Sequence, residues 1–281
     1  MESLIKFSGT VVITGTSSGI GRGLCKSFVE RGYNVFGTVR NKKDALELEK
    51  AFGQNFNAII MDVTNEKQVL EAKEKVKHHL GDKTLSALIN NAGIATLGPV
   101  EYLPTSDFKK QLDTKILGTF LCTKIFLPLL GTDHNLLGEP GRIINISSIL
   151  GGKIGSPFMS GYCASKHAVE AFSESLRREL KPFGIKVIIV APGSVSTPIW
   201  QTVKKQKEQN KFVKTKYSVP FKRILNSLEQ FDQNSLPMEK LANVIIESIE
   251  TKNPKIRYNP TKDYSQKIWP YIPKRIMDNF F

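Results

Sequence analysis

Short apolar runs rich in valine and isoleucine alternate along this chain with longer segments that have the apolar spacing of helices. The segment Asn65–Leu80, for example, carries an apolar stripe at Val69, Ala72, Val76 and Leu80. The strands that we predict are Thr10–Thr14, Asn34–Val39, Asn57–Met61, Leu85–Asn90, Arg142–Ile146, Ile185–Val190 and a short last strand near Lys255–Tyr258. Strands that are apolar on both faces and alternate with helices indicate a parallel sheet with right-handed crossovers. We therefore predict an α/β fold, a doubly wound parallel sheet of about seven strands with helices on both faces.

The length of the chain and the absence of linker-like segments in its sequence indicate how many domains it forms. The 281 residues suit one large α/β domain over residues 1–281, and no Pro/Gly linker or internal repeat divides them. Residues 198–237 depart from the strand–helix rhythm, since this stretch is polar, basic and punctuated by Trp200, Tyr217, Phe221 and Phe231. We expect it to be a mobile substrate-loop insertion at the end of a strand, followed later by a C-terminal tail over about 259–281.

Charge and cysteine content narrow the class of protein. The net charge of +14 is compatible with nucleic acid, acidic lipid surfaces or anionic cofactors as partners. No arginine-rich arm, zinc finger or RNA-binding aromatic signature is present, so we expect no nucleic-acid partner. Cys25, Cys122 and Cys163 are too few and too scattered for a disulfide framework or a zinc cluster, and we predict no metal site. With no signal-like or membrane-spanning apolar run in the sequence, we expect a cytoplasmic protein.

A glycine-rich loop follows the first predicted strand. It reads Thr14-Gly15-Thr16-Ser17-Ser18-Gly19-Ile20-Gly21 and leads into a helical pattern. Glycines let the backbone turn tightly and approach a diphosphate, and the helix that begins there offers free N–H groups and a positive dipole end. The loop therefore predicts a dinucleotide site, with a plain glycine turn as the alternative.

The end of the second strand bears on the choice of dinucleotide. An acidic side chain there would bind the ribose 2′-hydroxyl and select NAD(H), but the chain reads Val39-Arg40-Asn41. A guanidinium suits a 2′-phosphate, so NADP(H) is favoured over NAD(H), unless Arg40 is a surface residue that stacks on adenine. Asp62 and Val63 follow the third strand and are candidates for contact with the adenine. Asp62 could instead cap the next helix, a role also open to Thr64 or Asn65.

Tyr162 and Lys166 form a candidate proton-transfer pair. Four residues apart on a helix, they share one face. A free tyrosine has a pKa near about 10, and a fixed cation beside it favours the phenolate and lowers that pKa. The spacing alone is common, so the pair gains its meaning from the other motifs.

Taken together, these motifs resemble those of the short-chain dehydrogenase/reductase family. The Thr-Gly-x-x-x-Gly-Ile-Gly loop, Asn90-Asn91-Ala92-Gly93, Asn145-Ile146-Ser147-Ser148, Tyr162-x-x-x-Lys166 and Pro192-Gly193-Ser194-Val195-Ser196-Thr197 appear in the family's order over roughly residues 7–200. The resemblance implies a Rossmann-type fold. It also implies cofactor contacts from the glycine loop, Asn91, Ala92, Gly93, Pro192, Gly193, Val195 and Thr197.

The resemblance also implies roles in catalysis. Ser148 would hydrogen-bond the substrate oxygen, Tyr162 would be the general acid or base, and Lys166 would bind the nicotinamide ribose and lower the pKa of Tyr162. Ser147 is the competing serine, and the family places the catalytic hydroxyl second in the pair. These roles suit hydride transfer, which makes or removes a proton on oxygen.

Lys115 departs from the family pattern. Members carry an asparagine in a stretch like Asp-x-Asn-x-x-Gly, thought to support a water that leads from the active-site lysine to solvent, and this chain reads Asp113-Thr114-Lys115-Ile116-Leu117-Gly118. A charged lysine cannot accept a hydrogen bond. A second ammonium would favour the phenolate, or one lysine would become neutral. Three interpretations stay open: a tolerated variant with altered pH dependence, a severely slowed enzyme, or an engineered change.

The substrate and partners are predicted more coarsely. The pattern is similar to the hydroxysteroid and retinol dehydrogenase branch, which implies a hydrophobic alcohol or carbonyl substrate, and we expect Leu150, Phe158 and Trp200 to line its pocket. The family commonly pairs through its fourth and fifth helices, which implies a homodimer or homotetramer. The basic and aromatic C-terminus suggests peripheral membrane contact, or else packing over the substrate entrance. The alternatives to an NADP(H)-dependent oxidoreductase are a non-catalytic dinucleotide-binding scaffold and an NAD-linked dehydrogenase.

Overall fold

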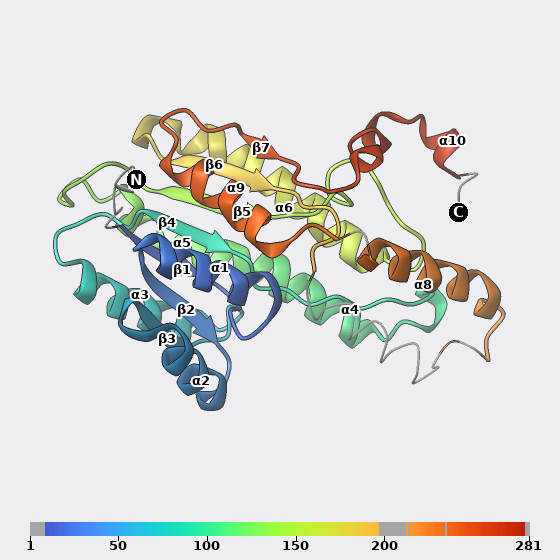
Figure 1. Cartoon of the computed structure of the whole chain (residues 1–281), viewed down its shortest axis with the longest axis horizontal. Helices are drawn as coiled ribbons and strands as arrows, with labels where there is room; N and C mark the ends of the chain where they lie inside the picture. Colours follow the sequence, from blue (N-terminus) through green and yellow to red (C-terminus); the bar gives the residue numbers. More distant parts are fainter. Residues whose placement is uncertain (1–8, 197–211, 213, 234, 279–281) are drawn as a thin grey trace, which may run out of the picture.

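A seven-stranded parallel sheet forms the centre of the computed structural model, which describes residues 9–196, 212, 214–233 and 235–278. The strands lie in the order β3-β2-β1-β4-β5-β6-β7 (Figure 1). Their bounds are β1 Thr10–Ile13, β2 Asn34–Val39, β3 Phe56–Ile60, β4 Ala87–Asn90, β5 Arg142–Ile146, β6 Lys186–Val190 and β7 Arg257–Tyr258. The order reverses between β1 and β4, and ligands of doubly wound sheets bind at such a switch point, beyond the carboxyl ends of the strands.

Helices cover both faces of the sheet. The α-helices are α1 Gly19–Arg31, α2 Lys42–Phe52, α3 Glu66–Leu80, α4 Thr105–Leu112, α5 Gly118–Phe126, α6 Ser160–Glu179, α8 Ser218–Gln233, α9 Met238–Glu250 and α10 Lys274–Met277. A π-helical turn, η3 Asp113–Leu117, joins α4 to α5. Short 3-10 turns are η1 Gly53–Asn55, η2 Val100–Tyr102, η4 Pro128–Leu130, η5 Lys181–Phe183, η6 Tyr264–Lys267 and η7 Trp269–Tyr271.

Alternation along the strands sends neighbouring side chains into two separate cores. In β1, Val11 and Ile13 join the core under α1, α2 and α9, while Val12 faces the core under α3, α5 and α6. All three side chains are fully buried. This two-sided burial is the reason that the strands read as continuous apolar runs, and it confirms the predicted fold class.

The predicted strands agree with the observed ones to within two residues at each end. Asn65 caps α3 by accepting a hydrogen bond from the Gln68 amide, so Asp62 does not have that role. Within the stretch 198–237, which was expected to be a mobile insertion, the structure has a regular helix, α8. Phe221, Ile224 and Leu225 of α8 are buried in a third apolar cluster. Figure 1 shows α4, α8 and α10 beyond the ends of the strands, on the right.

No helix in the described part of the chain combines the length and apolar character needed to cross a membrane.

Candidate active site

The glycine loop closes over the carboxyl ends of β1 and β4. Gly15 has φ +69°, and a Cβ there would lie 2.8 Å from the Cα of Ala92. A Cβ on Gly21 would lie 2.2 Å from the carbonyl oxygen of Gly15. Glycine is therefore required at both positions, at the first by conformation and close contact and at the second by close packing of α1 against the loop.

Four hydrogen bonds fix this loop to the residues that follow β4, the neighbour of β1 in the sheet. The Asn91 side-chain amide donates to the carbonyl oxygens of Thr14 (2.9 Å) and Gly15 (3.0 Å). The Thr14 hydroxyl accepts from the backbone amides of Asn91 and Ala92, both at 3.0 Å. Thr14 belongs to the motif but was not among the predicted binding residues, and its role is visible only once β4 lies beside β1.

A cleft of about 700 Å³ runs from this loop to Tyr162 and Lys166. Of the predicted cofactor residues it is lined by Gly15, Ser17, Ser18, Gly19, Ile20, Arg40, Asp62, Val63, Asn91, Ala92, Gly93, Tyr162, Lys166, Pro192, Gly193 and Val195. Thr16 and Gly21, also predicted to contact the cofactor, are not among the residues that line it. The Thr16 side chain is buried and its hydroxyl donates to the Thr38 carbonyl oxygen, which fixes the loop to β2. Thr197 lies outside the described residues.

Beside the ends of β2 and β3 the cleft is lined by two charged side chains, Arg40 and Asp62. Arg40 is exposed there and makes no hydrogen bond or ion pair to the described residues, so its guanidinium is available to a ligand. Asp62 accepts hydrogen bonds from the Thr64 amide (2.9 Å) and hydroxyl (2.7 Å). Burial alone would raise the pKa of the Asp62 carboxyl, but these hydrogen bonds and Arg40 outweigh it, so that pKa is lowered and Asp62 is an anion.

The residues present fit a dinucleotide. Ser18 precedes α1 without a side-chain cap, and no acidic residue occupies the first turn of that helix. Its first amides therefore face the cleft as donors, with the positive end of the helix dipole behind them. Together with the glycine cradle and the unpaired Arg40, this set of donors suits a diphosphate and a further anionic group.

Ser148 and Tyr162 meet at the inner end of the cleft. Both residues line the cleft, and the Ser148 hydroxyl lies close enough to the Tyr162 phenol to act on its pKa in the lowering direction. Ser147 points elsewhere, because its hydroxyl donates to the Glu170 carboxylate at 2.6 Å. The geometry therefore selects Ser148 from the serine pair as the partner of Tyr162.

Burial dominates the protonation of the Tyr162–Lys166 pair. The pKa of Tyr162 is raised because desolvation by burial outweighs the opposing effect of the Ser148 hydroxyl. This corrects the expectation of a lowered pKa, which considered the nearby cation and not the burial. Lys166 donates to the Ile146 carbonyl oxygen at 2.6 Å, and burial lowers its pKa to about 8, opposed by Glu170. In the ligand-free protein at neutral pH, Tyr162 is thus a phenol beside a mostly charged lysine.

Lys115 lies over the ring of Tyr162. Its Nζ is 3.9 Å from the ring centroid, against 5.9 Å for Nζ of Lys166. The side chain sits in the π-helical turn η3 and is only 4% exposed. Burial, reinforced by repulsion from Lys166, holds the pKa of Lys115 well below its usual range. Of the two outcomes expected for a second lysine, the structure favours a neutral amine, and a neutral amine accepts a hydrogen bond as an ammonium does not.

Of the predicted substrate residues that the structure describes, only Ser148 lines the cofactor cleft. Leu150 and Phe158 do not line that cleft and instead pack against the cluster that includes Phe221 of α8. Phe158 has φ +62°, a strained backbone for a non-glycine residue, and its ring meets that of Phe221 at 5.3 Å. Trp200 lies outside the described residues.

Fold and site together define a dinucleotide-binding oxidoreductase. The family model for short chain dehydrogenases matches residues 9–208. The chain therefore belongs to the short-chain dehydrogenase/reductase family.

Individual relatives extend this similarity over almost the whole chain. The chain is 35% identical to the NADPH-dependent 3-dehydrocapnine reductase of Ornithobacterium rhinotracheale, over 96% of this chain and 95% of the relative. It is 33% identical to retinol dehydrogenase 16 of Mus musculus, over 95% and 86%. Among solved structures, a short-chain dehydrogenase from Streptomyces avermitilis superposes with a TM-score of 0.77 at 25% identity, over 98% of this chain and 93% of that one.

Proposed function

We propose that the protein is an NADP(H)-dependent oxidoreductase that interconverts a hydrophobic alcohol and its carbonyl, with Tyr162 as the acid or base. The observation that carries the proposal is the Ser148–Tyr162 hydroxyl pair at the inner end of a glycine-walled cleft. When bound, the nicotinamide supplies or accepts the hydride. Side chains of this protein bind the substrate oxygen and transfer the proton.

In the reducing direction, the substrate carbonyl oxygen accepts hydrogen bonds from Ser148 and Tyr162. The Tyr162 phenol gives its proton to that oxygen as negative charge develops on it, while Ser148 stabilises the charge. The raised pKa of Tyr162 supports this direction, since a phenol that is protonated at neutral pH is ready to donate. In the oxidising direction the same oxygen returns its proton to a Tyr162 phenolate, which the charged Lys166 favours.

Arg40 supports the preference for NADP(H). It is the exposed cation at the end of β2, where a carboxylate would select NAD(H), and it makes no competing ion pair to the described residues. The name of the Ornithobacterium relative specifies NADPH, which agrees with this preference.

Two features support a hydrophobic substrate. The apolar cluster of Leu97, Met159, Phe221 and their neighbours lies at the start of α6, and Tyr162 packs against it. The names of the relatives specify 3-dehydrocapnine and retinol, and we propose a carbonyl or alcohol of comparable apolar character for this chain.

The test is nicotinamide absorbance with NADPH and NADH, using 3-dehydrocapnine, retinal, a ketosteroid and a small carbonyl. We expect turnover with at least one apolar substrate and its loss in Tyr162→Phe, with NADPH binding retained. Arg40→Ala should weaken NADPH binding by roughly 10-fold or more and leave NADH binding nearly unchanged, because a charge-assisted bond contributes about 1.5–3 kcal/mol. Arg22→Ala, which removes an arginine outside the cleft, is the control.

Two other results would redirect the proposal. Cofactor binding without turnover of any substrate would favour a dinucleotide-binding scaffold, for which the buried Lys115 is the motivating observation. A preference for NADH in the unchanged protein would contradict the role of Arg40 and favour an NAD-linked dehydrogenase.

A further inference from the structure

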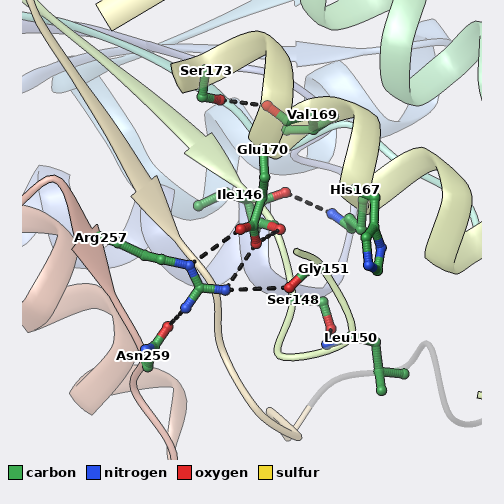
Figure 2. Close-up of polar contacts among 12 residues, drawn as sticks. Ile146, Ser148, Leu150, Gly151, His167, Val169, Glu170, Ser173, Arg257 and Asn259 are labelled. Atoms are coloured by element: carbon green, nitrogen blue, oxygen red, sulfur yellow. Dashed lines mark hydrogen bonds and ion pairs between the residues drawn. The ribbon is translucent and has the colours of Figure 1, made fainter. Parts of the chain in front are cut away.

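Glu170 lies one helical turn beyond Lys166 on α6, and its carboxylate is held from two directions. Ser147 donates to Oε1 at 2.6 Å. Arg257, the first residue of β7, approaches with Nε at 3.2 Å from Oε2 and Nη2 at 2.9 Å from Oε1 (Figure 2). The arginine is fixed in turn by Asn259, as Figure 2 also shows. This two-pronged contact joins the edge strand of the sheet to the helix that carries Tyr162 and Lys166.

The loop that presents Ser148 wraps around this carboxylate. A Cβ on Gly151 would lie 2.4 Å from the Ser147 hydroxyl and 2.7 Å from Oε1 of Glu170. A Cβ on Gly152, where φ is +90°, would lie 2.6 Å from Oε2 of the same carboxylate. The two glycines therefore allow the backbone just after Ser148 to close on Glu170. Nη2 of Arg257 also points at the Gly151 carbonyl oxygen, at 3.5 Å.

The charges around Lys166 give Glu170 a second role. Lys115 faces Lys166 from η3 and is repelled by it, and Tyr162 and Cys163 lie on the preceding turn of α6. Glu170 is the described group whose charge favours the ammonium of Lys166, while Arg257 on β7 partly neutralises that carboxylate. Removing the carboxylate and removing the guanidinium thus have opposite electrostatic effects at Lys166.

We propose that Glu170, clamped by Arg257, is a positioning residue of the active site that fixes the loop presenting Ser148 and supplies the counter-charge of Lys166. The proposal rests on the proposed function for its catalytic meaning. Neither residue belongs to the motifs of the glycine loop, the serine pair or the Tyr-x-x-x-Lys sequence.

The chain offers a matched control in a second Arg–Glu clamp. Arg31, the last residue of α1, contacts Glu250 with Nε at 3.0 Å and Nη2 at 2.8 Å, and the Tyr33 hydroxyl joins them at 3.3 Å. Both pairs combine a bidentate arginine with a hydroxyl on a mostly buried carboxylate. Because α1 starts at the glycine loop, Arg31 lies about 18 Å from that end of the helix. Glu250→Gln therefore perturbs a similar clamp far from the site.

The first measurement needs no substrate. Hydrogen exchange of the free protein is followed in peptides that span residues 147–156 for Glu170→Gln, Arg257→Met and Glu250→Gln. We expect at least about 10-fold faster exchange of these amides in the first two variants, since a lost charge-assisted clamp of about 1.5–3 kcal/mol raises local opening by that factor. Glu250→Gln should leave the same peptides unchanged. Equal exchange in all three variants would overturn the positioning role.

The second measurement separates charge from packing. In the reducing direction we expect the basic limb of the pH profile of kcat/KM to move down by roughly 0.5–1 pH unit in Glu170→Gln, because the Lys166 ammonium loses its counter-charge. Arg257→Met should move the limb up, since the carboxylate is then no longer shared. Glu170→Asp should restore the limb position of the unchanged protein. Shifts in the same direction for both variants would contradict the electrostatic role.

The pH dependence of NADPH binding provides the same comparison if no substrate is turned over. We expect the pH above which NADPH affinity falls to decrease in Glu170→Gln and increase in Arg257→Met. An absence of turnover together with these shifts would refute the proposed enzyme while supporting Glu170. Turnover with unshifted pH profiles would support the proposed enzyme and refute the role of Glu170.

Discussion

Lys115 shows how burial can change the chemistry of a residue that is read from sequence alone. As an ammonium it would repel Lys166 and could not accept a hydrogen bond, which is the basis of one of the three interpretations, a severely slowed enzyme. In the structure it is buried against the Tyr162 ring and its pKa lies well below the usual range. A lowered pKa favours the neutral amine, and a neutral amine can accept a hydrogen bond, as the family's asparagine can.

The same burial predicts how stability depends on pH. A lysine with a lowered folded-state pKa binds fewer protons in the folded than in the unfolded protein, from that pKa up to about 10.4. The cost of burying Lys115 is therefore full below its folded-state pKa and declines as pH rises to about 10.4. We predict that Lys115→Met raises the free energy of unfolding at pH 7 by about 1 kcal/mol or more, or roughly 2–4 °C in Tm.

Denaturation at pH 7 and pH 9.5 checks the sign. The advantage of Lys115→Met should shrink at the higher pH, whereas Lys110→Met, which removes an exposed lysine of α4, should give no such pH-dependent gain. An advantage that grows with pH would show that Lys115 is charged and stabilised in the folded protein.

At the scale of elements, the sequence predicted best those features that depend on local patterns. The strands followed from β-branched runs, and the glycine loop, Ser148, Tyr162 and Lys166 followed from ordered motifs. Long-range contacts were invisible: Glu170 and Arg257 are 87 residues apart, and only the pairing of β7 with β6 brings them together. The raised pKa of Tyr162 was likewise missed, because burial is a property of the packed molecule.

Two elements were missed for different reasons. The buried side chains of α8 recur at Phe221, Ile224 and Leu225 with helical spacing, but the surrounding lysines obscured that pattern. The π-helical turn η3 has no residue signature of its own. It interrupts the helix from Thr105 to Phe126 at Lys115, and such turns are frequent at functional sites.

The junction between α1 and the glycine loop gives the prediction at this scale. Gly21→Ala places a Cβ 2.2 Å from the Gly15 carbonyl oxygen, which only a backbone shift can relieve. We expect a loss of stability of about 1–3 kcal/mol and much weaker NADPH binding, because the shift moves the amides at the start of α1. Gly155→Ala is the control, since a Cβ there meets nothing within 4 Å. Denaturation and NADPH titration of both variants make the comparison, and equal behaviour would refute the close-packing argument.

For the whole molecule, we propose a homodimer or homotetramer that pairs through the helix containing η3 and α5 and through α6. Leu117 and Phe120 are exposed on one side of that helix, and Phe120 meets Phe172 of α6 edge-on, with ring centroids 6.4 Å apart. An apolar surface shared by two neighbouring helices suits a two-fold interface.

We predict that Phe120→Asp increases the dissociation constant of the oligomer by 10-fold or more, as measured by sedimentation velocity. Leu70→Asp on α3 changes a similarly exposed apolar residue and should have no effect, and an unchanged assembly in Phe120→Asp would exclude this face.

The C-terminal tail offers a different surface, and we propose that it contacts anionic membrane. Ile268, Tyr271 and Ile276 are more than half exposed, and Lys274 and Arg275 lie exposed among them. Aromatic and aliphatic side chains beside basic ones suit the interface of an acidic bilayer, where each basic residue contributes about 1 kcal/mol.

We predict that the protein floats with phosphatidylserine-containing vesicles at low salt and less so at high salt. The double change Lys274→Glu and Arg275→Glu should reduce binding by 10-fold or more. The pair Lys67→Glu and Lys75→Glu on α3 alters net charge equally and should not. Equal loss in both pairs would mean that the overall charge of +14 attracts the vesicles without a defined surface, and no flotation at all would leave the tail as a cover for the molecule's own substrate entrance.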